Sequence, residues 1–341
     1  MKIKNQILSF IAILAVALTT FSCTSDSPKE VTPLKSILAI AQADPANFSI
    51  LLDALKKTSL DATLGNAGSY TVFAPTNAAF TAAGITSASI ALMTPAQVAD
   101  LKVTLQNHVI GVGTRANDLL TAGYTRTFGF LRATSTATSG ANLSVFANTV
   151  GGNVLLNGGT ANGGAKVVTA DIQASNGILH VIDGVLKLPT IVDHIKANPS
   201  LSSLLGVVTS SAQAGVLTDL TAATGSVPVT VYAPNNDAFT TASTYLTGRT
   251  DAQVTNILRY HLEKSNRLSS SATSFTSSSA TADVSVTTLY KAPADTKFTI
   301  LLGTVKIKDV IGTTNANIKI TNIQGTNGVV QVIDKVLQPF L

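Results

Sequence analysis

The chain lacks most of the residues that build chemical sites. It has one cysteine, no tryptophan, four histidines and only 12% charged residues among 341. A single cysteine excludes an internal disulfide, so stability must come from packed cores. The motifs HExxH, CxxC, GxSxG and a glycine-rich phosphate loop do not occur. These absences argue against an enzyme, and we expect no catalytic residue, no metal site and no cofactor.

Charge and aromatic content are low as well. The net charge is +5 at pH 7 and falls to +3 if residues 1–22 are removed, because Lys2 and Lys4 leave with them. That charge is too weak to indicate a nucleic-acid partner. Aromatic residues make up 5% of the chain, which weakens the case for a stacking platform for sugars or bases.

The N-terminus has the pattern of a secretory signal over residues 1–22. Two lysines precede the apolar run Ile7–Leu18, which is too short to stay in a bilayer as a spanning helix. The segment resembles a bacterial lipoprotein signal that ends at Cys23, the future lipid attachment site, although Thr20 stands where leucine is usual. Ordinary cleavage with an incidental Cys23 is the alternative. Residues 23–33 would then be a polar tether to the membrane.

What the chain does contain is a pair of repeated boxes. Tyr70–Phe80 returns as Val229–Phe239 with 7 identities in 11 positions, and Ala165–Leu186 returns as Ala316–Leu337 with 10 in 22. The offsets are 159 residues (Pro75 to Pro234) and 151 residues (Gly177 to Gly328). Solenoid repeats run at only ~20–50 residues, so this spacing predicts a duplicated globular domain.

The predicted domains are residues 34–189, called the first repeat below, and residues 190–341, called the second repeat. Each has the ~150 residues of an ordinary domain. They meet at Leu188-Pro189-Thr190, a join so short that it leaves little room for independent tumbling.

The first box predicts a strand that turns into a helix. Val72 and Phe73 have strand character, Pro75 ends the strand, and Thr76 can cap a helix that places Phe80 on the core. The second repeat has the same pattern in Val231, Tyr232, Pro234, Asn235 and Phe239. The second box predicts a hairpin, because Asn176-Gly177 and Asn327-Gly328 each lie between apolar runs. We expect positive φ at both glycines.

These boxes resemble the fasciclin (FAS1) family. The residues that carry the resemblance are Thr71–Asn77 with Phe80, and Asn176–Asp183 with Val185-Leu186. The family also has a Tyr-His pair after a helix, present here as Tyr260-His261 but as Asn107-His108 in the first repeat. Gln331 stands where the first repeat has His180. The resemblance implies an α+β fold: two tandem domains, each a β-sandwich wedge with packed helices.

We expect these motif residues to be structural. They are Thr71, Pro75, Asn77, Phe80, His108, Asn176, Gly177, His180 and Asp183 in the first repeat, and Thr230, Pro234, Asn236, Phe239, Tyr260, His261, Asn327, Gly328 and Asp334 in the second.

The four histidines show no metal-ligand spacing. We expect His108 and His261 to be half-buried and bonded to the backbone of a neighbouring loop, in preference to contacting a ligand. His180 would be a cross-strand or surface residue, and His194 would be exposed. Asp183 and Asp334 would accept hydrogen bonds from free amides at strand ends, and Asn77 and Asn236 would be turn or cap residues.

Three functions remain open at this stage. The resemblance implies an envelope-anchored adhesion or binding protein that contacts cells, matrix or extracellular polymer, with an unknown protein or polysaccharide ligand. The lipid would place it in the bacterial envelope, at the outer membrane, on the periplasmic or surface face. The alternative is a periplasmic or surface module that binds a small molecule or polysaccharide. A hydrolase has no nucleophile–base pair to support it.

Overall fold

The structure is a computed structural model that describes residues 33–131, 141–269, 283–291, 297–301, 304, 306–312 and 314–341. The predicted signal, Cys23 and all of the tether before residue 33 lie outside the described residues. Lys35–Leu341 forms a compact unit. Within the described ranges no single helix is long and apolar enough to cross a membrane. One bent pair, Pro199–Val208 with Ser211–Thr221, passes that test by length and composition and turns by 76° at its break.

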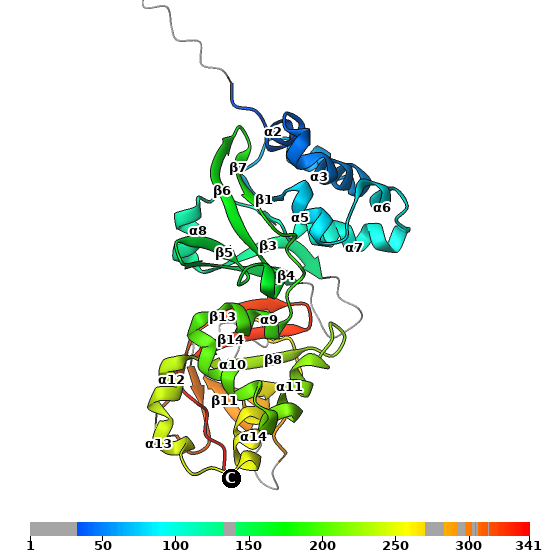
Figure 1. Cartoon of the computed structure of the whole chain (residues 1–341). Helices are drawn as coiled ribbons and strands as arrows, with labels where there is room; N and C mark the ends of the chain where they lie inside the picture. Colours follow the sequence, from blue (N-terminus) through cyan, green and yellow to red (C-terminus); the bar gives the residue numbers. More distant parts are fainter. Residues whose placement is uncertain are drawn as a thin grey trace, which may run out of the picture. The chain divides into compact units, whose positions relative to one another are not determined.

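The first repeat is a mixed sheet with a group of helices packed against it (Figure 1). Its helices are α2 (Ile37–Gln42), α3 (Pro45–Thr58), α4 (Asp61–Gly65), α5 (Asn77–Ala82), α6 (Ser87–Ala91), α7 (Pro95–Gln106), α8 (Ala116–Ala122) and the short η1 (Thr160–Asn162). Its strands are β1 (Tyr70–Pro75), β2 (Val109–Ile110), β3 (Tyr124–Leu131), β4 (Ala141–Val150), β5 (Asn153–Leu156), β6 (Ala165–Ala174) and β7 (Gly177–Ile182). They follow the order β2-β1-β7-β6-β5-β4-β3 in one sheet.

The second repeat has a matching set of elements. Its helices are α9 (Ile191–Ala197), η2 (Pro199–Leu201), α10 (Ser202–Val208), η3 (Ser211–Gln213), α11 (Ala214–Thr221), α12 (Asn236–Thr241), α13 (Ser243–Leu246) and α14 (Asp251–Tyr260). Its strands are β8 (Val229–Pro234), β9 (Leu262–Glu263), β10 (Val284–Thr287), β11 (Lys297–Leu301), β12 (Lys306–Lys308), β13 (Ala316–Gly325) and β14 (Gly328–Ile333). Their order in the sheet, β9-β8-β14-β13-β12-β11-β10, matches that of the first sheet strand for strand. The predicted tandem α+β fold is therefore confirmed.

The two repeated boxes lie side by side in each sheet. Strand β1 from the first box pairs in parallel with β7 from the second, from Tyr70 opposite Gly177 to Pro75 opposite Ile182. Strands β8 and β14 pair in the same way, from Val229 opposite Gly328. Each second box also forms the predicted hairpin, β6 with β7 and β13 with β14. The boxes therefore recur together because they build one structural unit.

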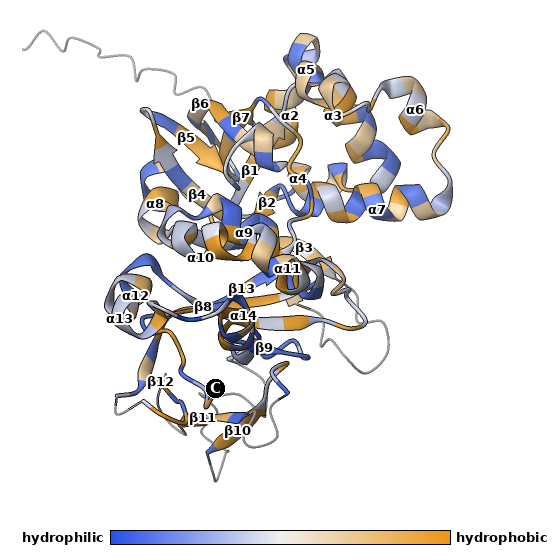
Figure 2. Cartoon of the chain, turned by 60° about the horizontal axis from the view of Figure 1, so that its bottom comes forward, coloured by the Kyte–Doolittle hydropathy of each residue, from blue (hydrophilic) through white to orange (hydrophobic). Residues whose placement is uncertain are grey.

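Strand β1 is buried on both faces, which explains its nearly continuous apolar sequence. Val72 and Ala74 belong to the core under the helices, where Leu51 and Leu101 also lie. Phe73 belongs to a second core on the other face of the sheet. Figure 2 shows α3 and α7 with hydrophobic and hydrophilic residues alternating along them, as expected for helices with one face on a core.

Local signals set the start of the helix after each buried strand. The Thr76 side chain accepts a hydrogen bond from the Ala79 N–H at 3.2 Å, and Asn235 accepts one from Ala238 at 2.9 Å. Both N-caps were predicted. Phe80 is fully buried in the core below, and Phe239 is partly buried against two clusters of the second repeat. The proline that ends each strand thus leads directly into a capped helix.

Candidate binding cleft

The histidines of the family motif are buried and fully bonded to backbone. His108 Nδ1–H donates to the Thr104 carbonyl at 2.7 Å, and its Nε2 accepts from the Leu186 N–H at 2.9 Å. His261 makes the same pair of bonds, to Ile257 and Leu337, at 2.8 Å each. Burial lowers the pKa of both imidazoles to about 4. Each neutral ring therefore joins the end of a helix to the segment after the last strand, more deeply buried than the half-buried position expected.

His194 was expected to be exposed, and this expectation is wrong. Its side chain is almost fully buried, burial lowers its pKa to about 4, and its Nε2 bonds the Gln324 carbonyl at 3.1 Å. The reason is helical spacing. Ile191, His194 and Ile195 share one face of α9, and that face packs on the sheet.

The Asn-Gly turns anchor the first helix of each repeat. Asn176 Oδ1 accepts from the Ile37 N–H at 2.9 Å, and its amide donates to the carbonyls of Leu64 and Asn66 at 2.8 Å. Asn327 accepts from Ile191 in the same way at 2.9 Å. The glycines that follow have φ values of 146° and 152°, which confirms the predicted positive φ.

The remaining motif side chains are also hydrogen-bonded within the fold. Asp183 accepts from Lys166 N–H and Asp334 from Asn317 N–H, both at 2.7 Å. Asn77 and Asn236 do not cap their own helices. They accept from Ile50 N–H and Ser203 N–H at 2.9 Å and so hold α3 and α10.

Tyr260 of the second repeat donates a hydrogen bond to the Lys297 carbonyl at 2.8 Å. At the matching position of the first repeat, the Asn107 side chain instead accepts a hydrogen bond from the Thr127 hydroxyl at 3.0 Å.

His180 and Gln331 perform the same task with different groups. His180 Nδ1 accepts from the Asp171 N–H at 3.2 Å, and its Nε2–H donates to the Thr114 carbonyl at 3.1 Å. Gln331 Oε1 accepts from Asn322 N–H at 2.9 Å, and its Nε2 donates to the Arg267 carbonyl at 2.8 Å. Asp171 and Asn322 both have φ near 60°, in matching bulges of β6 and β13. Each position thus requires one acceptor and one donor at fixed places, which either residue supplies.

This equivalence predicts an asymmetric mutational result. His180→Gln should change the free energy of unfolding by less than about 1 kcal/mol, whereas His180→Leu should cost about 2 kcal/mol, because it leaves a backbone N–H and a carbonyl without their partner. Urea midpoints of the two variants provide the measurement. Equal destabilisation by glutamine and leucine would show that ring packing against Phe73, at 5.7 Å between centroids, matters more than the hydrogen bonds.

Motif residues also hold the segment that follows the short edge strand of each sheet, β2 in the first repeat and β9 in the second. Thr71 Oγ1 donates to Val112 and accepts from Thr114 N–H at 2.6 and 2.7 Å. In the second repeat, Thr230 donates to Ser265 and accepts from Arg267 N–H at 2.8 and 2.9 Å. Arg267 is therefore fixed at its N–H by one motif residue and at its carbonyl by Gln331. The motif positions a loop whose side chains differ between the repeats.

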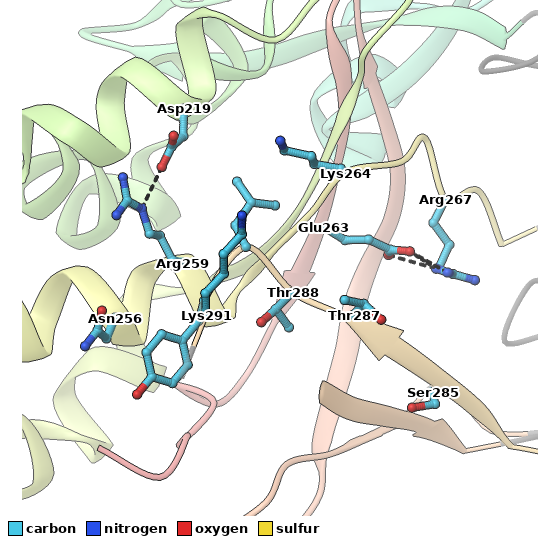
Figure 3. A pocket seen from close by; sticks show the side chains of 12 residues that line it. Asp219, Asn256, Arg259, Glu263, Lys264, Arg267, Ser285, Thr287, Thr288 and Lys291 are labelled. Carbon is cyan, nitrogen blue, oxygen red and sulfur yellow. Dashed lines mark hydrogen bonds and ion pairs between the residues drawn. The ribbon is translucent and has the colours of Figure 1, made fainter. Parts of the chain in front are cut away.

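In the second repeat this loop forms one wall of a cleft of about 770 Å³. The lining residues come from α11, α14, β9, β10 and the segments after the two strands: Asp219, Asn256, Arg259, Glu263, Lys264, Arg267, Ser285, Thr287, Thr288, Leu289, Tyr290 and Lys291. Figure 3 shows the Asp219–Arg259 pair on one side, the Glu263–Arg267 pair on the other, and Lys264 and Lys291 between them. The cleft thus contains four basic and two acidic side chains.

Both acidic groups of the cleft are already paired. Arg259 Nε lies 2.8 Å from Asp219. Arg267 forms a forked ion pair with Glu263, which also accepts from the Tyr232 hydroxyl at 3.0 Å. Burial opposes the charge of Arg267, but its hydrogen bonds and charge contact with Glu263 outweigh burial, so its pKa lies above the ordinary value. The guanidinium is therefore charged and held in one place.

The matching segment of the first repeat has no such charges. The segment Arg259–Arg267 reads RYHLEKSNR, whereas Gln106–Thr114 reads QNHVIGVGT. Phe73 and Ile110 stand where the second repeat has Tyr232 and Glu263. The apolar hollow of about 100 Å³ beside His108 is a different feature, because its leucines match those of the small apolar hollow beside His261 in the second repeat. Because a buried ion pair rarely stabilises a fold more than apolar residues would, stability does not explain the charged version.

The cleft residues were not predicted, yet the sequence carried a signal for them. In a chain with 12% charged residues, four charged side chains gather in nine positions of the second repeat. Only a comparison of the two repeats isolates them. Among the described residues, no group of three or more His, Cys, Asp or Glu could hold a metal ion.

The fasciclin family profile agrees with this two-domain architecture. The sequence profile of the fasciclin domain matches residues 46–189 and 199–339. The chain is 29% identical over 202 residues to Protein sll1483 of Synechocystis sp., an alignment that covers 55% of this chain and 99% of that protein. A solved FAS1 domain pair from the insect cell adhesion molecule Fasciclin I aligns with a TM-score of 0.46 at 16% identity, over 88% of this chain and 95% of that one.

Proposed function

Because the chain belongs to the fasciclin domain family over both of its repeats, we propose that it is an envelope-anchored adhesion or binding protein without catalytic activity. Its partner would be a cell surface, a matrix or an extracellular polymer. Tandem fasciclin domains support an adhesion or binding-type module in general. The contact with one polymer and the anchoring in a bacterial outer membrane are the finer parts of this proposal.

The observation that supports this proposal most is that the motif residues shared by the two repeats serve the fold through hydrogen bonds. In both repeats the motif histidine bonds backbone through both ring nitrogens. With a pKa of about 4, neither ring suits proton transfer near neutral pH. The shared motif thus holds a loop whose side chains differ between the two repeats. A rigid scaffold that positions such a loop is typical of a binding protein.

Retention of a partner is the test of this function. Beads that carry residues 23–341 at fixed density should retain the producing cells or their extracted extracellular polymer. Beads with the heat-unfolded chain at the same density serve as the control. Retention no higher than on the control would contradict the proposal.

We expect Cys23 to carry lipid and residues 1–22 to be absent from the mature protein. The charged start, the apolar run and the lone cysteine motivate this expectation. The wild type should enter the detergent phase on partitioning, whereas Cys23→Ala should stay in the aqueous phase. Aqueous wild-type protein would refute lipid anchoring and leave the binding function to be tested separately.

A second candidate is binding of a small molecule or polysaccharide on the periplasmic or surface face. The polar cleft of the second repeat favours it, since about 770 Å³ lies in the usual range for ligand sites. Mass spectrometry of the natively purified protein separates the candidates. A stoichiometric small ligand would support this second function, and its absence would favour the first.

A further inference from the structure

We infer that the cleft of the second repeat binds an acidic saccharide, with its basic side chains meeting anionic oxygens and its neutral polar side chains meeting sugar hydroxyls. This inference deepens the proposed function, since it names the chemistry of the polymer that would be bound. It rests on the charge, the lining and the size of the cleft.

The cleft has positive charge that its own carboxylates do not neutralise. Both carboxylates are committed, Asp219 to Arg259 and Glu263 to Arg267. Within the described part of the chain, the ammonium groups of Lys264 and Lys291 have neither an ion pair nor a hydrogen bond. The site therefore carries a net charge of two positive, from two lysines that face the same hollow (Figure 3). A ligand with carboxylate or sulfate groups would neutralise them.

The rest of the lining suits a hydroxyl-rich ligand. Val286 of β10 is buried in the core, and its neighbours Ser285 and Thr287 are exposed on the opposite face, as the period of a strand requires. Asn256 adds an amide from α14. These side chains offer donors and acceptors for sugar hydroxyls. The aromatic ring in the wall, Tyr290, is buried and bonds the Phe340 carbonyl at 3.0 Å, so it offers no stacking platform for a nucleobase.

The two repeats supply an internal comparison. The segment of the first repeat that matches Arg259–Arg267 is Gln106–Thr114, and it has no charged side chain. The inference therefore assigns the acidic saccharide to the second repeat alone, and not to the fasciclin fold as such.

Direct binding by the full mature chain tests the inference. The probes are a labelled oligogalacturonate, a sulfated oligosaccharide and a neutral malto-oligosaccharide of equal length, measured by fluorescence anisotropy. At least one anionic probe should bind, and the neutral probe should bind about tenfold more weakly or not at all. Affinity should fall when NaCl rises from about 50 mM to about 300 mM, because salt screens exposed charges. The two anionic arms distinguish a carboxylate from a sulfate ester.

Paired lysine variants decide whether the cleft is responsible. Lys264→Ala with Lys291→Ala should weaken binding of the anionic probe about tenfold, and arginine at both positions should restore it. Lys306→Ala with Lys308→Ala removes the same charge from exposed positions of β12 in the same repeat and should change the affinity less than about twofold. Equal loss in both pairs, or equal binding of the neutral probe, would overturn the inference.

Failure of this inference is distinguishable from failure of the proposed function. If beads with the Lys264→Ala/Lys291→Ala chain retain cells as the wild type does, adhesion stands and the cleft assignment falls. If the wild type binds neither anionic probe, the cleft assignment falls whatever the beads retain. Saccharide binding without retention would leave the cleft in place and contradict adhesion.

Discussion

Replacing Gly177 with alanine should lower the free energy of unfolding by about 3 kcal/mol, which is at the upper end of single-residue effects. Gly177 has a φ of 146°, in a region that residues with a Cβ rarely adopt. A Cβ built there would lie 2.0 Å from the Tyr70 carbonyl oxygen, a backbone atom of β1. Because β1 is packed between two cores, it cannot move aside without disturbing both. Gly328 faces Val229 with the same 2.0 Å approach, so Gly328→Ala should behave alike in the second repeat.

Gly206→Ala is the matched control. Gly206 is exposed inside helix α10, has no atom within 4 Å of a built Cβ, and is not at positive φ. Alanine there should leave stability unchanged or raise it by up to about 1 kcal/mol. Urea unfolding of the three variants provides the measurement. A midpoint for Gly177→Ala equal to that of Gly206→Ala would mean that the tight approach of β7 to β1 is not a constraint on the fold.

Signals that act over a few residues were readable from the sequence. Thr76 and Asn235 cap the helices they were expected to cap, and the Asn-Gly pairs form the expected turns. The resemblance placed the histidine after a helix, and α7 and α14 end at Gln106 and Tyr260, with the histidine just beyond. The two N-cap side chains contact backbone three residues away, and each Asn-Gly turn joins strands that are adjacent in sequence, so these signals lie within one window of sequence.

Features that depend on distant partners were missed. Parallel pairing of β1 with β7 joins segments from the two boxes, and no local pattern encodes it. Strand β3 was overlooked because Gly129 interrupts it and its register with β4 shifts between Arg126 and Phe130. His194 was judged by its polarity, although its helical spacing with Ile191 and Ile195 placed it inward. The cleft required residues from several elements, so it emerged only when the fold brought them together.

The largest functional effect should come from separating the repeats. If each repeat contacts the partner weakly, the short join at Leu188-Pro189-Thr190 keeps the second contact at a high effective concentration. Tandem binding can then exceed the binding of either repeat by ~10²–10⁴ without any new contact. Each repeat has a complete seven-stranded sheet made from its own strands, so either should fold alone. We therefore expect both single repeats to bind the cell's partner far more weakly than the tandem.

The most direct measurement is retention of cells or extracellular polymer on beads that carry equal densities of Cys23–Leu341, Cys23–Pro189 or Thr190–Leu341, each checked for a cooperative melt. The account predicts strong retention by the tandem and weak retention by each single repeat. Retention by Thr190–Leu341 equal to that of the tandem would end the avidity argument and place binding in the second repeat, where the basic cleft lies. Retention by Cys23–Pro189 equal to that of the tandem would contradict both the avidity argument and a role for the cleft in adhesion.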